Sequence, residues 1–139
     1  MRQASESTGD ALGLPLALVN VSFADLAALD AAEEVEIETV AADGAIHRTI
    51  IWVVVDGQRV YVRSVRGEVA RWYREAIARA EVALHLAGRR IAMRVEPAAD
   101  EASVAACSAG LRRKYRADHS LRAMLMPDVL GTTLVLEVA

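Results

Sequence analysis

The sequence lacks the patterns that usually indicate a disulfide framework, a metal site or a membrane span. Its 139 residues include a single cysteine, Cys107, so no disulfide can form within the chain, and cysteine content does not constrain the redox compartment. No apolar run approaches the roughly 20 residues of a membrane-spanning helix. The three histidines have no metal-ligand spacing, and no Gly-x-Ser-x-Gly motif occurs. We therefore expect no metal and no membrane partner, and the catalytic residues are unknown.

An excess of positive charge is also missing, because the formal net charge is −3. Domains that bind nucleic acids usually carry a basic excess, so we expect no nucleic-acid partner. The positive charge is nevertheless clustered, with six arginines from Arg59 to Arg79 and a second group within residues 112–116. Such clusters in an acidic protein can attract a small anionic ligand, although solvated strand and helix faces are the commoner explanation.

The chain is long enough for one domain with its own core. We expect this domain to span residues 22–139, after a flexible N-terminal segment over residues 1–21 whose first ten residues are polar. The run Ala11–Val21 is apolar and could be a signal peptide. Two acidic residues before the run and two helix breakers inside it argue against export; these are Glu6, Asp10, Gly13 and Pro15. The expected location is the cytoplasm.

The spacing of apolar residues predicts a mainly β protein with helices. The expected strands are Val35–Thr39, Ile46–Val55, Gln58–Val65, Val82–Ala87, Arg90–Pro97 and Thr132–Val138. The expected helices are Phe23–Ala32, Val69–Ala80, Asp100–Arg116 and a short one within Asp118–Leu125. Asp-Gly pairs between strands indicate tight hairpins. Six strands joined in this way would expose their edges unless the sheet closes, so the pattern favours a small antiparallel barrel with helices over its openings.

Three finer predictions follow from the same patterns. The six apolar residues Ile50–Val55 predict a central strand covered on both faces. His85 is interpreted as a surface residue. Four glutamates are interpreted as a solvated strand edge; these are Glu33, Glu34, Glu36 and Glu38.

The segment Tyr61–Gly67 is the strongest candidate for a binding site. It is expected to run from a strand into a helix, which places Arg63, Ser64 and Arg66 close to a helix N-terminus. Cationic groups, a hydroxyl, backbone N–H donors and the positive end of a helix dipole are the components of a phosphate site. The alternative is that Arg63 and Ser64 form the solvent face of a half-exposed strand.

Other residues bear on this candidate site. Glu68 is expected at the same helix N-terminus, where its carboxylate would compete with a phosphate. Lys114 lies at the edge of the apolar stripe of its helix, so its ammonium could reach a site while its stem covers apolar surface, and ordinary snorkelling is the alternative. Trp52, Trp72 and Tyr73 are expected in the core.

Several segments together resemble one superfamily of small barrels. They are Ile51–Gly57, Val60–Ser64, Gly67, Trp72-Tyr73, Lys114-Tyr115 and Gly131–Leu134. These segments resemble the split-barrel superfamily of pyridoxamine-phosphate oxidases and deazaflavin-dependent nitroreductases and quinone reductases. Within it the chain is most similar to a bacterial branch known as domain of unknown function 2255, over roughly residues 35–139. The resemblance implies a six-stranded antiparallel split β-barrel with flanking helices.

The resemblance also implies a cofactor, either FMN or a deazaflavin coenzyme, often held at a homodimer interface. Its phosphate would be bound by Arg63, Ser64 and Arg66, and its ring would lie near Trp52 or Tyr61. The expected cofactor-binding residues are Tyr61, Arg63, Ser64, Arg66, Gly67 and Lys114. The expected function is flavin or deazaflavin binding, with hydride transfer to a small organic substrate as the chemistry if the protein is an enzyme. The alternative is a non-catalytic dimeric binding or structural protein that has lost the cofactor, which the position of Glu68 favours.

Overall fold

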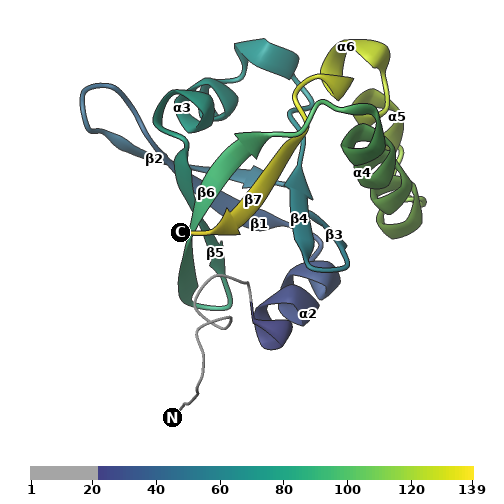
Figure 1. Ribbon diagram of the computed structural model, residues 1–139, viewed down its shortest axis with the longest axis horizontal. Coiled ribbons are helices and arrows are strands. Elements are labelled where there is room, and N and C mark those ends of the chain that lie inside the picture. Colours follow the sequence, from purple (N-terminus) through teal and green to yellow (C-terminus); the bar gives the residue numbers. More distant parts are fainter. Residues whose placement is uncertain (1–21) are drawn as a thin grey trace.

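The computed structural model describes residues 22–139 as a curled antiparallel sheet with helices around it (Figure 1). The strands are β1 (Val35–Val40), β2 (Ile46–Ile51), β3 (Val54–Asp56), β4 (Arg59–Val62), β5 (Glu81–Leu86), β6 (Arg89–Pro97) and β7 (Leu134–Val138). The helices are α2 (Phe23–Ala31), α3 (Arg71–Arg79), α4 (Glu101–Lys114), α5 (Leu121–Met124) and α6 (Pro127–Leu130), with a 3₁₀ turn η1 (Gly67–Val69). The flexible segment and the apolar run predicted within residues 1–21 lie outside the described residues.

The order of the strands explains the curl of the sheet. The seven strands pair antiparallel in the order β2-β1-β5-β6-β7-β4-β3, so β2 and β3 are the two edges. These edges are consecutive in sequence, with only Trp52 and Val53 between them. Because each residue extends the chain by less than 4 Å, the two edges must lie close together. The sheet is therefore a barrel that is split between β2 and β3, which confirms the predicted fold class.

The number of strands differs from the prediction, because the single strand expected over residues 46–55 is broken at Trp52–Val53. Backbone groups of Val53 bond to the side chains of Lys114, the last residue of α4, and of the following residue Tyr115, instead of a neighbouring strand. Its N–H donates to the Tyr115 hydroxyl at 3.3 Å, and its carbonyl accepts from Lys114 Nζ at 2.8 Å. The prediction of a central strand covered on both faces is also wrong, since β2 is an edge strand and Ile50 is 61% exposed.

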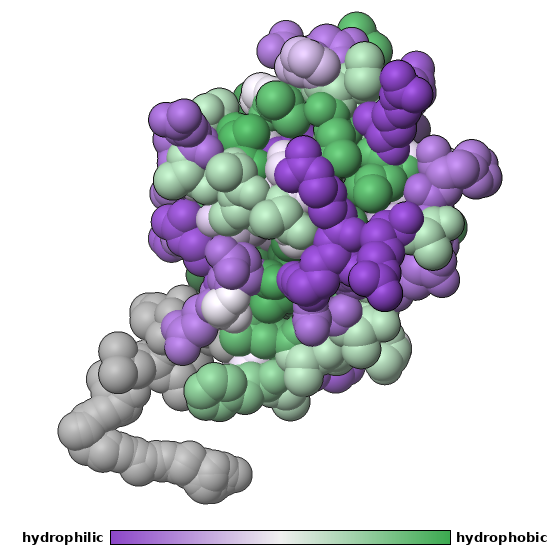
Figure 2. Space-filling view, turned by 90° about the vertical axis from the view of Figure 1, so that its right-hand side faces the viewer, coloured by the Kyte–Doolittle hydropathy of each residue, from purple (hydrophilic) through white to green (hydrophobic). Residues whose placement is uncertain are grey.

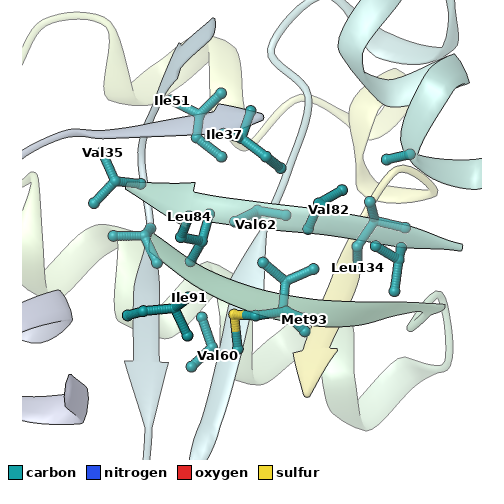
Figure 3. Close-up of a cluster of buried hydrophobic side chains, with 14 of the residues drawn as sticks. Val35, Ile37, Ile51, Val60, Val62, Val82, Leu84, Ile91, Met93 and Leu134 are labelled. Atoms are coloured by element: carbon teal, nitrogen blue, oxygen red, sulfur yellow. The ribbon is translucent and has the colours of Figure 1, made fainter. Parts of the chain in front are cut away.

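The main core fills the barrel, where alternate residues of the strands point inward (Figure 3). Helix α2 closes one end with Leu26 and Leu29, and α3 closes the other with Trp72 and Ala76 (Figure 1). The core position predicted for Trp72 is confirmed. Val69, expected on the same helical stripe, is 67% exposed because η1 is a separate turn and α3 begins only afterwards. None of the helices within residues 22–139 has the length and apolar character that crossing a bilayer requires.

A second core lies outside the barrel, where α4 covers β3 and β4. Alternation along β4 sends Val60 and Val62 into the barrel and Tyr61 toward α4. Helix α4 starts with a capped N-terminus, since the Asp100 carboxylate accepts from the Ser103 N–H at 3.0 Å. Figure 2 shows the molecule from the right-hand side of Figure 1, where α4 and α5 lie. Many hydrophilic side chains are exposed on this face.

The predicted solvated edge is wrong for Glu38. This side chain is buried and accepts hydrogen bonds from Arg90 at 2.9 and 3.1 Å and from His85 at 2.7 Å. Hydrogen bonding by Arg90, and then by His85, lowers the pKa of Glu38 to about 2. The reason is topological: β1 lies inside the sheet, so β5 and β6 supply partners for its outward-facing carboxylate. His85, predicted on the surface, is only 17% exposed in its side chain.

Candidate functional site

A cleft of about 520 Å³ opens beside the split in the barrel. Its walls come from the end of β2, the connection between β4 and η1, the start of α3, and α5 with the residue before it. The apolar lining residues are Ile50, Ile51, Trp52, Val65, Ala70, Trp72 and Met124. The polar ones are Glu34, Thr49, Arg63, Ser64, Arg66, Arg71 and Ser120. Three of the expected site residues, Arg63, Ser64 and Arg66, thus meet at one cleft.

Arg63 is a buried cation without a counter-ion among residues 22–139. Only 2% of Arg63 is exposed, so the alternative that it lies on the solvent face of a strand is wrong. Its guanidinium donates to the hydroxyls of Thr133 (2.9 Å) and Ser108 (2.9 Å). It also donates to the carbonyls of Met124 (3.0 Å) and Val104 (3.1 Å). Burial lowers the pKa of Arg63. All four partners are neutral, so the positive charge itself is not compensated by a carboxylate of the described residues.

Ser64 and Gly67 shape the turn that forms one wall of the cleft. The Ser64 hydroxyl donates to the Gly67 carbonyl at 2.7 Å, and the Gly67 N–H donates to the Ser64 carbonyl at 3.0 Å. Gly67 has φ +73°, a left-handed conformation that favours glycine. Ser64 is fully buried and lines the cleft, whereas Gly67 is not among the lining residues.

Arg66 and Arg71 carry the accessible positive charge of the cleft. Both residues are exposed, and Arg66 makes no ion pair within residues 22–139. Arg71 is the first residue of α3 and donates to the Thr49 hydroxyl at 3.2 Å. Sequence reasoning missed Arg71 because it started the helix at Val69, which placed this arginine inside the helix. The only sequence signal was its place in the cluster of six arginines.

The N-terminus of α3 is open to the cleft. Its N-cap is Ala70, which provides no side-chain hydrogen bond, and its first turn contains no acidic residue. The first N–H groups of a helix have no partner within the helix and carry partial positive charge. Glu68 lies in η1 and is not among the lining residues, so the predicted competition at the N-terminus of this helix is not seen.

Tyr61 and Lys114 lie away from the cleft lining. Tyr61 is buried beneath α4, and its hydroxyl accepts from Arg59 at 3.0 Å. Lys114 donates to the carbonyls of Leu29 (2.9 Å) and Val53 (2.8 Å), and burial lowers the pKa of Lys114 to about 8. It therefore joins the end of α2 to the split in the barrel.

Trp52 provides a flat wall at the split. Its ring stacks on Tyr115 with 4.0 Å between the centroids and 3° between the planes. Tyr115 is fixed in turn by donating to the Glu33 carbonyl at 2.6 Å. Trp52 was predicted in the core, and the structure places it half-buried and facing the cleft. A tryptophan held by stacking keeps one orientation and can present its edge or face to a planar ligand.

The composition of the cleft suits a ligand with an apolar planar part and an anionic group. Three arginines face one glutamate, Glu34, and aliphatic and aromatic side chains complete the walls. No histidine, cysteine or tyrosine lines the cleft, and Met124 is its single sulfur-containing residue. Within residues 22–139 there is also no group of three or more His, Cys, Asp or Glu side chains that could hold a metal ion.

Known structures share this fold. The chain has a TM-score of 0.56 and 14% identity to a protein proposed to be a pyridoxamine 5′-phosphate oxidase from Listeria innocua, covering 82% of this chain and 88% of that one. A structure described as an F420 reductase gives a TM-score of 0.56 and 17% identity, covering 85% and 94%. The haem storage protein HutZ from Vibrio cholerae gives 0.58 and 12%, covering 80% and 84%. At these identities the similarity concerns the fold alone.

The sequence itself matches one family model. No curated protein matches the chain. The family model, which describes uncharacterised proteins conserved in bacteria, matches residues 25–136 and so covers nearly all of the described residues, from α2 to β7. The split barrel, its cleft and this match agree with the resemblance drawn from the sequence. The chain belongs to the DUF2255 family, and its fold is that of the split-barrel proteins.

Proposed function

We propose that this protein binds a phosphorylated flavin, FMN or a deazaflavin coenzyme, in the cleft beside Trp52. The observation that carries the proposal is Arg63, a buried cation without a carboxylate partner in residues 22–139, at the wall of a cleft that also holds Arg66 and Arg71. A buried charge is costly unless it is paired. An anionic ligand would supply the missing negative charge.

The arginines of the cleft differ in how many N–H donors they have left for a ligand, so we expect them to have different roles. Four of the five N–H groups of Arg63 are already donated within the protein, so Arg63 contributes mainly its charge. Arg66, Arg71 and the uncapped N-terminus of α3 offer donors for a phosphate. Trp52 and Ile50 would contact the ring system. When bound, a flavin would supply the hydride chemistry, and the proposed activity is hydride transfer to a small organic substrate.

Two other ligand assignments have less support. Haem-binding relatives share the fold, and arginines can bind haem propionates, but haem iron usually takes a histidine, cysteine, tyrosine or methionine ligand. Among the lining residues only Met124 belongs to that set, and it is buried and 4% exposed. The alternative of a barrel that has lost its cofactor was favoured by Glu68 alone, and Glu68 does not line the cleft.

The proposal extends to a homodimer in the cytoplasm, as the resemblance and the composition imply. Ile50 and Val65 at the rim of the cleft are 61% and 49% exposed, and a second copy that covers this rim would bury them. Light scattering of the purified protein checks this part of the proposal. A monomer at micromolar concentration would contradict it.

Titration with FMN, riboflavin and a deazaflavin coenzyme tests the ligand. We expect FMN to bind at least tenfold more tightly than riboflavin, because only FMN carries the phosphate that Arg66 would contact, and tenfold corresponds to ~1.4 kcal/mol. Arg66→Gln should reduce this preference. Arg74→Gln is the matched control, since Arg74 is an exposed arginine of α3 outside the cleft lining. Absence of binding by all three ligands would refute the proposal.

A further inference from the structure

Arg71 is the most firmly held of the accessible arginines at the cleft. It is the first residue of α3, and its side chain is 48% exposed. Nη2 donates to the Thr49 hydroxyl of β2 at 3.2 Å, and Nε lies 3.8 Å from a Glu75 carboxylate oxygen, one turn along the same helix. Neither contact uses Nη1. The guanidinium is therefore tied on one side, and the other side is left for a ligand.

Glu75 is itself fixed by residues of β1 and β2. The Thr39 hydroxyl donates to Glu75 Oε1 at 2.7 Å, and His47 Nδ1 lies 3.1 and 3.2 Å from the two carboxylate oxygens. Thr39 and His47 are cross-strand partners, so the carboxylate is held above the β1–β2 pair. The Glu75 side chain is only 12% exposed. Burial acts to raise the pKa of Glu75, but these hydrogen bonds and the nearby cations outweigh it and lower the pKa, which keeps the carboxylate ionised.

This arrangement connects a buried carboxylate to the cleft through a single arginine. Glu75 does not line the cleft, whereas Arg71 and Thr49 do. A buried, ionised glutamate close to a proposed anion site would oppose anion binding if its charge acted alone, because like charges repel. The position of Glu75 is compatible with an anion site if the main effect of its carboxylate is to orient the guanidinium of Arg71. Preorganised donors bind more tightly because less side-chain freedom is lost on binding.

We propose that Arg71 contacts the anionic group of the ligand in the cleft and that Glu75 is its positioning residue, held in turn by Thr39 and His47. The inference rests on the proposed function for the identity of the ligand, but it applies to any phosphate group that enters the cleft. Arg71 acts directly. Glu75 acts only through Arg71.

The test measures the binding of FMN, riboflavin and pyrophosphate to the intact protein and to Arg71→Gln, Glu75→Gln and the double variant. We expect Arg71→Gln to weaken FMN and pyrophosphate binding about tenfold, the effect of one charge-assisted hydrogen bond, and to leave riboflavin unchanged. Glu75→Gln should weaken both anions about threefold or more, although it makes the protein less negative. Because Glu75 acts through Arg71, the double variant should bind no more weakly than Arg71→Gln alone.

Each of the other possible binding results distinguishes the roles of Arg71 and Glu75 from the proposed flavin binding. Tighter anion binding by Glu75→Gln would show that its charge dominates and would overturn the positioning role. An Arg71→Gln protein that binds FMN as the intact protein does would overturn the contact and leave the proposed function standing. Pyrophosphate binding that depends on Arg71, without flavin binding, would support the inference and refute the flavin. Binding of neither anion would overturn both.

A second variant covers the case in which Glu75→Gln unfolds the protein. Thr49→Val removes the hydroxyl that accepts from Arg71 Nη2, which is the other anchor of this arginine, and valine has nearly the same shape as threonine. We expect the same loss of FMN and pyrophosphate affinity with an unchanged melting temperature. Unchanged affinity in folded Thr49→Val would count against the positioning of Arg71.

Discussion

Replacing Glu38 by glutamine should reveal a carboxylate that stabilises the barrel in a strongly pH-dependent way. The side chain is 10% exposed and accepts three charge-assisted hydrogen bonds, two from Arg90 and one from His85. Glu38→Gln keeps the shape and removes the charge. The new amide group would also place its N–H donors against the donors of Arg90 or His85.

The size of the effect follows from the pKa of Glu38, which hydrogen bonding by Arg90 lowers from an ordinary value of 4.5 to about 2. At ~1.36 kcal/mol for each pH unit, this difference corresponds to an upper value of ~3.4 kcal/mol. The Arg90 side chain is 55% exposed, and solvent screening there reduces the expected value to ~2 kcal/mol. Because the pKa is lower in the folded state, this stabilisation is complete above about pH 5 and disappears as the pH falls toward 2.

Urea unfolding of both proteins at pH 7, 4 and 2.5 measures this dependence. We expect Glu38→Gln to be ~2 kcal/mol less stable at pH 7, with about three quarters of this difference left at pH 4 and about a quarter at pH 2.5. The matched control is Glu36→Gln on the same strand, whose ion pair with Arg48 is exposed and should contribute at most ~0.5 kcal/mol. A difference that is independent of pH, or no larger than the control's, would refute this reasoning.

Two further substitutions test the contacts of α4. Gly110→Ala should destabilise the protein by ~1–3 kcal/mol, because the new Cβ would overlap Val54 Cγ1. Gly131→Ala is the control and should be nearly neutral, since the space around Gly131 is open. Equal melting temperatures of the two variants would contradict the packing of α4 on β3. Burial lowers the pKa of Lys114 to about 8 from 10.5, so the unfolded chain binds more protons in that range. The intact protein should therefore gain stability relative to Lys114→Met as the pH rises from 8 to 10, and a falling difference would contradict it.

Local patterns were sufficient for much of the fold. The Asp56-Gly57 pair predicted the hairpin between β3 and β4, and Gly57 has the left-handed φ of +62° that such turns use. The alternation of side chains along a strand puts Val60 and Val62 on one face and Tyr61 on the other, and the structure has Val60 and Val62 in the barrel and Tyr61 against α4. These features depend on neighbours in sequence, which is why the sequence alone predicts them.

Features that depend on distant residues were not predictable in this way. The break at Val53 exists because Lys114 and Tyr115 bond to its backbone, and they lie more than 60 residues further along the chain. The burial of Glu38 requires Arg90 on β6. The place of Arg71 at the cleft depends on where α3 begins, and helix boundaries are the least certain part of a pattern.

Mapping the FMN site by NMR tests the central claim most directly. Amide shifts of the ¹⁵N-labelled protein during titration with FMN should change at the cleft, in residues 49–52, 63–66 and 70–72, and the Arg63 and Arg71 side-chain Nε–H signals should move with them. The same titration with riboflavin should produce smaller changes at Arg66 and Arg71. Absence of shifts at saturating FMN, or shifts confined to the neighbouring surface around His85 and Arg90, would contradict the claim that this cleft binds a phosphorylated flavin.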